Sequence, residues 1–392
     1  MLQIAPDRFQ PVPGSQPAAP GVLVSNVASS IREIGRDAWN ACHPGQVEDF
    51  DCLLAIEQAG IEGFTWRYVT VLADDRVVAA MPAFLCPYSL DTTLEAGSIR
   101  RAIHRIKQIF PGFLTLKLAC LGSPCTETGV AGFHPDVPDY LRAVLFARLL
   151  DAFEAHAATE GCSLIGAKDI AGTTAPEVAT QLSQRGYAAI GGLPTAWLDI
   201  DFDSIDAYMA RLSGGTRKDM RRKLKSFGDV RVEIRTDFGD LLPRVMELYA
   251  DTRDRSEWQF EELTAEYFSG ILNHMKGRSF CCFYFVGDRL LAANLLVHNE
   301  ETLIDKFFCM DGEEGRPYNL YFLSWFTNLR YCLDHGLNRY QSGQAYYENK
   351  VRLGSQLTPN SMFFRHRNRL VQSVLRLVSP LFSADEASGQ RQ

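Results

Sequence analysis

Residues 66–85 read WRYVTVLADDRVVAAMPAFL, and residues 280–298 read FCCFYFVGDRLLAANLLVH. In both stretches, aromatic and β-branched residues flank a short polar turn, a pattern that predicts a β-hairpin. The seven residues that begin at Asp75 and the seven that begin at Asp288 share four identities. The two halves of the chain therefore contain hairpins of the same design.

The elements predicted after each hairpin come in the same order. A strand that ends near a cysteine is followed by a helix, by a glycine suited to a left-handed C-cap, and by a further strand. In the first half these are 114–123, 139–160 and Gly161, and in the second half 302–312, 318–335 and Gly336. Chance agreement between two ordinary α+β domains is the alternative. We favour a duplicated unit, which predicts an α/β (α+β) fold with two mixed, mostly antiparallel sheets flanked by helices.

The composition is that of an ordinary globular protein, with 392 residues, 46% of them hydrophobic and 22% charged. The formal charge of -7 argues against a nucleic-acid coat, and we expect no DNA partner. The length favours two or three domains. We expect a disordered Pro-rich arm, an N-terminal domain, a C-terminal domain with a basic helix (213–227) and the active site, and a disordered tail, over residues 1–24, 25–195, 196–382 and 383–392.

The ten cysteines are scattered and form no C-x-x-C pair, which indicates small buried side chains in a reducing compartment and no metal site. No signal peptide and no apolar stretch long enough to span a membrane is found, so we expect a cytoplasmic protein. Two basic amphipathic stretches, 99–110 and 370–381, suit peripheral contact with the inner face of the cytoplasmic membrane. The alternative is that both are surface helices that face the core.

A cluster of six Lys or Arg residues lies between 217 and 225, in a chain that is acidic overall. Thr216 and Asp219 fit a capping box for this helix. The basic side chains are suited to the phosphates of coenzyme A, tRNA or a lipid headgroup, and the alternative is a solvated helix face. The predicted substrate-binding residues here are Arg217, Lys218, Arg221 and Arg222.

Two further segments carry groups suited to acid–base chemistry. Residues 339–354 read RYQSGQAYYENKVRLG and place a carboxylate, a lysine and two phenols together, although an ordinary polar loop would look the same. Residues 303–319 set charges inside an apolar strand and continue into a glycine-containing turn before a helix, whose N-terminus can bind pyrophosphate. From these segments we select Gln344, Tyr347, Glu348, Lys350, Arg352, Asp305, Lys306, Arg316 and Asn319, and we add Tyr321 from the helix that follows.

Three stretches together resemble the FemAB-like group of the GNAT acyltransferase superfamily, whose members are often described as peptidoglycan biosynthesis or recognition proteins. They are SGGTRKDMRRKLKSF (213–227), YFVGDRLLAANLL (284–296) and HGLNRYQSGQAYYENKVRLG (335–354). The resemblance covers most of the chain, from about Ile31 to Phe364. The group's late motif usually reads GAQGEHK-x-x-RG. Its Glu, Lys, Arg and final Gly are kept here, whereas Asn349 stands at the usual His and the middle of the motif is rewritten.

The resemblance implies two GNAT folds, with the acyl donor bound in the second. In GNAT enzymes the pantetheine of a thioester lies between splayed strands, and an amine attacks the carbonyl. The superfamily's pyrophosphate loop is poorly kept, and Glu314–Pro317 is its nearest match. The donor is therefore acyl-CoA, acyl-carrier protein or aminoacyl-tRNA. We expect no tightly bound cofactor, with a coenzyme A thioester as co-substrate.

The roles expected at the site follow from that chemistry. Glu348 is the expected base, Lys350 and Lys306 are candidate oxyanion donors beside Asp305, and Tyr321 or Tyr347 is expected to protonate the leaving thiolate. The preferred function is an N-acyltransferase for groups other than aminoacyl groups, acting on a lipid amine, because the departures from the motif resemble bacterial ceramide synthases of sphingolipid biosynthesis. The rivals are a FemAB-type aminoacyltransferase that uses charged tRNA on peptidoglycan precursors, and a non-catalytic ligand-binding module.

Overall fold

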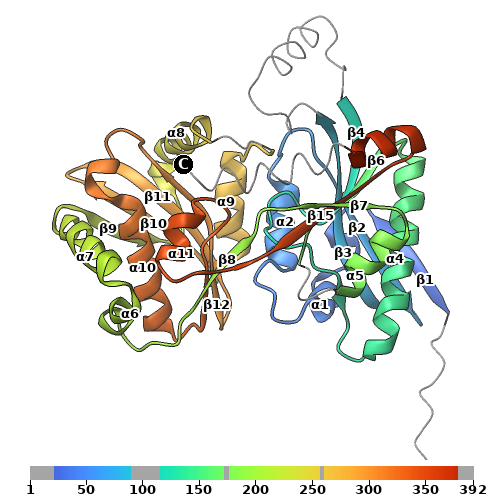
Figure 1. The fold of residues 1–392 in the computed structure, drawn as a ribbon, viewed down its shortest axis with the longest axis horizontal. Helices are drawn as coiled ribbons and strands as arrows, with labels where there is room; N and C mark the ends of the chain where they lie inside the picture. The colour runs from blue at the N-terminus through green and yellow to red at the C-terminus, as the bar shows by residue number, and fades with distance from the viewer. Residues whose placement is uncertain (1–21, 90–114, 172–175, 257–259, 378–392) are drawn as a thin grey trace, which may run out of the picture.

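The described part of the computed structural model covers residues 22–89, 115–171, 176–256 and 260–377, and it contains two β-sheets that lie side by side (Figure 1). The first sheet has the strand order β1-β2-β3-β4-β6-β15-β7, with β5 paired to β3, and the second has the order β14-β8-β13-β12-β11-β10-β9. Only β4–β6 and β12–β13 are parallel among the described pairs. The predicted fold class, two mixed and mostly antiparallel sheets with flanking helices, is confirmed.

The first half begins with β1 and the predicted hairpin, whose strands β2 and β3 are joined by Asp74 and Asp75 in the left-handed conformation. The strand β4, the helix α4 and the parallel strand β6 follow, as expected. The elements of this half are β1 (Leu23–Ala28), η1 (Ile31–Glu33), α1 (Arg36–Cys42), α2 (Phe50–Gln58), β2 (Thr65–Ala73), β3 (Arg76–Ser89), β4 (Thr115–Leu121), β5 (Gly132–Phe133), α4 (Asp139–Thr159), β6 (Leu164–Ala171), α5 (Pro176–Gln184) and β7 (Ala188–Gly191).

The second half repeats this order, with the hairpin β10–β11, the strand β12, the helix α10 and the parallel strand β13. Its elements are β8 (Thr195–Asp199), α6 (Ile205–Arg211), α7 (Gly214–Lys223), η3 (Leu224–Asp229), β9 (Arg231–Arg235), η4 (Gly239–Leu241), α8 (Leu242–Asp254), α9 (Ala265–His274), β10 (Ser279–Val286), β11 (Arg289–His298), β12 (Thr302–Met310), η5 (Arg316–Tyr318), α10 (Leu320–His335), β13 (Arg339–Gln341), α11 (Tyr347–Arg352), β14 (Gln356–Thr358) and β15 (Asn360–His366).

The chain passes between the two sheets twice. After β7 it enters the second sheet at β8, and after β14 it returns to the first sheet, where β15 lies between β6 and β7 (Figure 1). The sequence placed residues 196–382 in one continuous C-terminal domain. The strand Asn360–His366 of that segment pairs instead in the first sheet, and the expected boundary falls inside β8.

Each half has a hydrophobic core of its own, and a further core cluster spans both halves, where α2 packs against α9 at the junction (Figure 1). Polar contacts close the same junction. Arg278, just before β10, binds Asp49 at 2.9 Å and Asp51 at 3.0 Å, and both carboxylates are almost completely buried. The halves are therefore fixed to each other through apolar and ionic contacts.

Some expectations concern residues outside the described part. The stretch 99–110, the arm up to residue 21 and the tail belong to this group, and the stretch 370–381 is described only as far as Leu377. All ten cysteines are buried with free thiols, as predicted. Among the described residues, no helix has the length and apolar character needed to cross a bilayer, and no cluster of three metal-ligating side chains is found.

Candidate active site

The two parallel strands at the centre of the second sheet, β12 and β13, pair over only three positions and then separate. The last pair is Ile304 with Gln341, so the strands part from Asp305 onward. On its other side, β12 contains a bulge: Phe307 pairs with Leu295 and Asp305 with Leu296, which leaves Lys306 unpaired. A bulge of this kind redirects a side chain. Asp305 and Lys306 thus lie at the opening of the second sheet, the point where β12 and β13 separate, on the side of the first half.

Asp305 is held in place by three donors. Its Oδ2 accepts hydrogen bonds from Asn294 at 3.1 Å, Asn328 at 3.3 Å and the Tyr340 hydroxyl at 3.2 Å, and these three residues are buried. Burial raises the pKa of Asp305 to about 6, although the Asn294 hydrogen bond and the charge of Lys350 lower it. The residue as a whole is partly buried, and its carboxylate is fixed beside the point where β12 and β13 separate.

Lys350 lies on α11 and is 3% exposed. Its ammonium donates to the carbonyl oxygen of Gly343 at 2.6 Å. Burial lowers the pKa of Lys350 to about 8, against the opposing charges of Glu127 and Asp305. A buried amine that titrates near neutral pH beside two carboxylates is characteristic of acid–base sites.

Glu127 reaches the same place from the first half, in the segment between β4 and β5. Its Oε2 accepts a hydrogen bond from Gln341 at 2.6 Å. Burial raises the pKa of Glu127 to about 7, and Lys350 lowers it. Glu127 is not among the site residues predicted from the sequence. The available signal was its position shortly after a strand in the duplicated unit, where polar residues of an α/β sheet collect.

Lys306 binds across the junction between the halves. Its ammonium pairs with Glu48 and donates to the carbonyl oxygen of Cys125 at 2.6 Å. The Lys306 and Glu48 side chains are only 4% and 9% exposed. Burial opposes the charge, yet Glu48 holds the pKa of Lys306 well above its usual range. Lys306 is therefore a permanent cation that connects β12 to two segments of the first half.

The other residues predicted in the late motif have different surroundings. Tyr347 donates to the Pro194 carbonyl at 2.9 Å and Gln344 to the Leu193 carbonyl at 3.0 Å. Tyr347 thus fastens α11, and Gln344 the segment before it, to the crossing between β7 and β8. Glu348 is exposed on α11, and no described residue forms a hydrogen bond or ion pair with it. Its role as the base stays a prediction.

Tyr321, on α10, has a buried hydroxyl group without a hydrogen-bond partner among the described residues. Burial raises the pKa of this phenol, and the nearby charge of Asp305 raises it further. Its ring lies 5.9 Å from that of Tyr346 in the late motif. The structure thus places Asp305, Lys350 and Tyr321, three of the residues selected from the sequence, near one another and adds Glu127; their catalytic roles stay predictions.

The basic helix α7 begins earlier than the capping box indicated. Ser213 caps it by accepting a hydrogen bond from the Thr216 N–H at 3.2 Å, and the box of Thr216 and Asp219 does not form. Asp219 instead accepts hydrogen bonds from Arg222 at 2.8 Å and Arg352 at 2.7 Å. These contacts connect α7 to α11 and so to the residues around Lys350.

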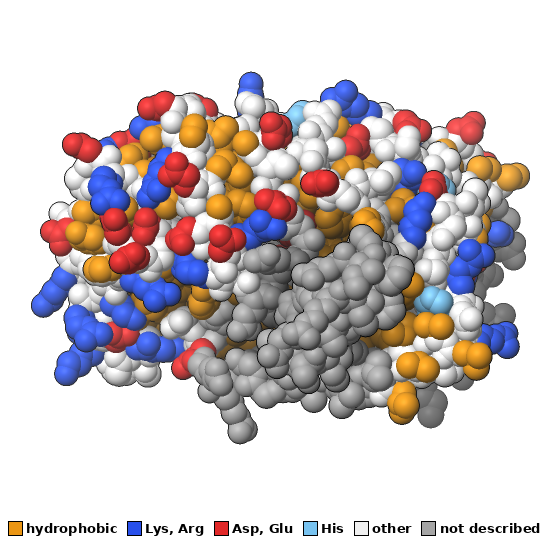
Figure 2. Space-filling view, turned by 90° about the horizontal axis from the view of Figure 1, so that it is seen from above, with side chains coloured by type: hydrophobic (Ala, Val, Ile, Leu, Met, Phe, Trp, Pro, Cys, Tyr) orange, Lys and Arg blue, Asp and Glu red, His pale blue; other side chains and the backbone are white. Residues whose placement is uncertain are grey.

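The remaining basic side chains of α7 differ in exposure. Lys223 pairs with Asp219 at 3.1 Å and its side chain is 17% exposed. Arg217 donates to the carbonyl oxygen of Ala210 at 3.1 Å, while Lys218 and Arg221 are exposed and have no partner in the described part of the chain. On the face drawn in Figure 2, Lys and Arg side chains are frequent at the end of the molecule that the second half forms, with Asp and Glu side chains among them. The exposed cations Lys218 and Arg221 are suited to contact with a polyanion.

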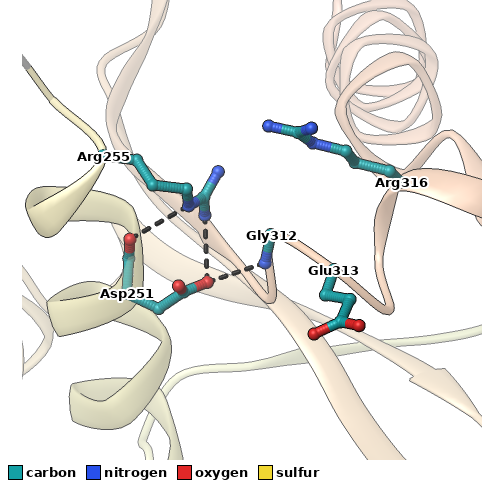
Figure 3. A pocket seen from close by; sticks show the side chains of 5 residues that line it. All are labelled: Asp251, Arg255, Gly312, Glu313 and Arg316. Atoms are coloured by element: carbon teal, nitrogen blue, oxygen red, sulfur yellow. Dashed lines mark hydrogen bonds and ion pairs between the residues drawn. The ribbon is translucent and has the colours of Figure 1, made fainter.

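A hollow of about 450 Å³ opens at the far end of β12, and Asp251, Arg255, Gly312, Glu313 and Arg316 line it (Figure 3). Arg255 binds Asp251, and the Arg316 side chain is exposed. Asn319 donates to the Ser226 hydroxyl at 3.2 Å instead of facing this space. The hollow mixes equal numbers of acidic and basic groups. The buried groups around Lys350 are therefore the stronger candidate for chemistry.

These features define a class of protein: a tandem GNAT acyltransferase fold with titratable groups where the second sheet opens. FemX has the same fold, with a TM-score of 0.57 and 15% identity over 90% of this chain and 100% of FemX. A tandem GNAT protein from the clavulanic acid biosynthesis pathway gives a TM-score of 0.52 and 12% identity over 88% of this chain and 99% of that one.

The chain belongs to the FemAB-like family, described as peptidoglycan biosynthesis/recognition, which matches residues 138–380. A protein of Mycobacterium tuberculosis described as 8-amino-7-oxononanoate synthase 2 is 22% identical over 326 residues, or 81% of this chain. The chain spans only 42% of the length of that relative. The resemblance to the FemAB-like group is thus confirmed, whereas these comparisons give no support to the narrower likeness to a ceramide synthase.

Proposed function

We propose that the protein transfers an aminoacyl group from charged tRNA to an amine of a peptidoglycan precursor. Membership of the FemAB-like family supports this choice. The sequence had favoured the transfer of an acyl group other than aminoacyl to a lipid amine, and the family favours the aminoacyl alternative instead. The observation that carries the proposal is the group formed by Asp305, Lys350 and Glu127 where β12 and β13 separate. In a GNAT fold this is where the acyl carbonyl and the amine are expected to meet.

The pKa values of this group suit amide formation. Bringing an alkyl ammonium of pKa near 10 to its free amine at pH 7 costs about 4 kcal/mol, so a proton acceptor at the amine matters. Carboxyl groups with pKa values of about 6 and 7 take up a proton readily, and an ammonium with a pKa of about 8 releases one. Acceptor and donor are thus present at one place.

The test uses the full chain with three donors, alanyl-tRNA, acetyl-CoA and palmitoyl-CoA, and two acceptors, a lysine-containing UDP-muramyl pentapeptide and sphinganine. Mass spectrometry follows the amide product. We expect amide only from alanyl-tRNA and the pentapeptide. Amide from palmitoyl-CoA and sphinganine would support a lipid N-acyltransferase instead. Tight binding of the pentapeptide without any amide would support a non-catalytic binding module.

The outward side chains of α7 give a prediction about the donor. The double variant Lys218→Ser/Arg221→Ser is expected to bind alanyl-tRNA about tenfold more weakly, because two phosphate contacts are lost. The slope of log K against log salt concentration is expected to fall by about 1 to 2. The measurement is fluorescence anisotropy over a salt series. The matched control is Arg142→Ser/Arg148→Ser, which removes two exposed arginines from α4. Equal loss in both variants would contradict a specific role for α7.

A further inference from the structure

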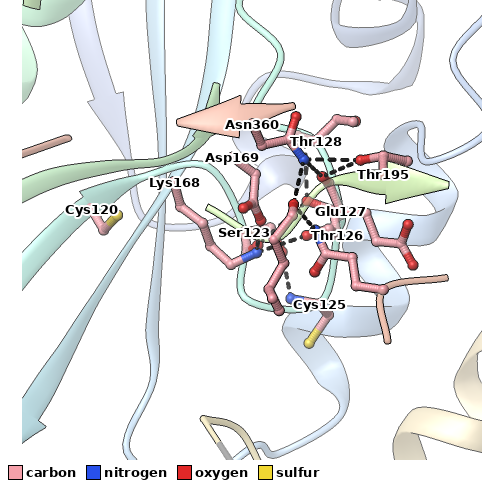
Figure 4. A network of polar contacts seen from close by, with 12 residues as sticks. Cys120, Ser123, Cys125, Thr126, Glu127, Thr128, Lys168, Asp169, Thr195 and Asn360 are labelled. Atoms are coloured by element: carbon pink, nitrogen blue, oxygen red, sulfur yellow. Dashed lines mark hydrogen bonds and ion pairs between the residues drawn. The ribbon is translucent and has the colours of Figure 1, made fainter. Parts of the chain in front are cut away.

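The segment that carries Glu127 is fixed through its backbone. Three consecutive carbonyl oxygens each accept a hydrogen bond from a side chain of another element: Cys125 from Lys306 at 2.6 Å, Thr126 from Lys168 at 2.9 Å, and Glu127 from Asn360 at 3.2 Å. Figure 4 shows Lys168, on β6, and Asn360, on β15, converging on this segment. Because three successive carbonyl groups are held by side-chain donors, the backbone of this segment is fixed in position. The direction of the Glu127 side chain is therefore fixed as well.

The Glu127 and Lys350 side chains both approach Gly343. A Cβ atom at Gly343 would lie 3.4 Å from Oε1 of Glu127 and 3.7 Å from Nζ of Lys350. The carboxylate and the ammonium therefore face the same small space, which a side chain at this position would occupy. Gly343 also has a φ of +83°, which disfavours other residues. The space between the two groups is thus preserved by the backbone itself.

The duplication explains where this segment comes from. The parallel strands β4 and β6 last pair at Leu121 and Ala167, as β12 and β13 do at Ile304 and Gln341. In the first half, however, the chain after β4 fills the opening. Gly129 packs so closely on β6 that a Cβ atom there would collide with the Lys168 carbonyl oxygen, and its N–H donates to the Asp169 carbonyl at 2.8 Å.

We infer that the first half supplies a catalytic residue to the second: Glu127 accepts the proton of the attacking amine, while Lys350 protonates the leaving group. This inference rests on the proposed acyl transfer. In the first copy of the unit, the segment after β4 fills the space where β4 and β6 separate. The same segment places Glu127 at the corresponding opening between β12 and β13 in the second copy.

The amine, having lost one proton to water on binding, attacks the acyl carbonyl, so that a C–N bond forms and the bond from carbon to the carrier oxygen or sulfur breaks. The second proton of the amine passes to the Glu127 carboxylate, and the Lys350 ammonium gives a proton to the departing oxygen or sulfur. Transfer of the proton from Glu127 to Lys350 then restores both groups. Their pKa values, about 7 and about 8, make this return nearly neutral in energy.

The first test is the pH profile of kcat/KM for the active pair of substrates. Glu127 must be ionised and Lys350 protonated, so activity is expected to rise through an apparent pKa near 7 and to fall through one near 8, values that belong to the coupled pair. Glu127→Gln keeps the size of the side chain and its acceptor for Gln341, yet we expect about a 100-fold loss and no rise near pH 7. Glu154→Gln, which removes a half-buried carboxylate bound to Arg365, is the matched control.

The second test needs no substrate. The infrared carbonyl band of a protonated carboxylic acid is followed from pH 5 to 9. Wild type is expected to lose a component near pH 7 that is missing in Glu127→Gln and kept in Glu154→Gln. If wild type forms amide and Glu127→Gln retains its activity and pH profile, the inference falls and the proposed function stands. If no substrate pair reacts, the proposed function falls. Absence of the infrared component, or its persistence in Glu127→Gln, overturns the inference in either case.

Discussion

Lys350→Met is expected to lower kcat/KM for amide formation by about 100-fold or more, the usual contribution of a general acid–base group. Two effects act together. The buried ammonium that protonates the leaving group is lost. In addition, Lys350 lowers the pKa of both Glu127 and Asp305, so its removal raises both above their values of about 7 and 6. At pH 7 a larger share of each carboxyl group is then protonated and unable to accept a proton.

The sign of this change gives a second readout. Because the carboxyl groups of the variant ionise at higher pH, the rising limb of its pH profile is expected to move to higher pH than in wild type. Initial rates over a pH series measure it. The control is Lys117→Met, which removes an exposed lysine on β4 that pairs with Glu160 at the end of α4, and it is expected to keep the wild-type profile. Full activity of Lys350→Met with an unshifted profile would remove Lys350 from the chemistry.

Lys306→Met is expected to lower the free energy of unfolding by about 3 to 5 kcal/mol, because it leaves the buried Glu48 carboxylate without its partner. The Lys306 and Glu48 side chains are only 4% and 9% exposed, so water cannot solvate the Glu48 carboxylate once the ammonium is lost. The Cys125 carbonyl also loses its donor. Urea unfolding followed by intrinsic fluorescence measures the change.

A double variant separates the charge pair from other effects. Replacing both partners, as Lys306→Met/Glu48→Leu, removes the uncompensated carboxylate and is expected to recover at least half of the lost stability, since an apolar pair often replaces a buried ion pair at little cost. The sequence placed Lys306 among the catalytic residues. If the Lys306→Met protein keeps wild-type stability but loses turnover, Lys306 is a catalytic residue. That result would contradict the stabilising role that we infer from its ion pair with Glu48.

Local pattern predicted most of the fold. The two hairpins, the strand and helix after each of them, and the parallel strand at the end of each unit are set by residue periodicity and turn chemistry within short segments. The capping box at Thr216 was wrong because Ser213, three residues earlier, offers the same cap to a longer helix. The return of β15 to the first sheet leaves no local signal, since its partners on β6 are far away in the sequence.

Local pattern also explains why only part of the candidate site could be selected from the sequence. Asp305, Lys350 and Tyr321 come from one half, and their segments carry visible charges or phenols in an apolar setting. Glu127 looked like any polar residue in a turn. Its burial depends on Gln341 and Asn360, more than two hundred residues away, and only the packing of the two halves brings them together.

The position of β15 has a consequence for how the protein is made. A ribosome releases β6 and β7 long before β15, which must insert between them to complete the first sheet. Until then, those two strands present unpaired edges, which favour association with other chains. The pairing of such distant segments also slows folding. The first sheet of the growing chain therefore stays incomplete while nearly all of the second half is synthesised. Chaperone protection would matter most during this period.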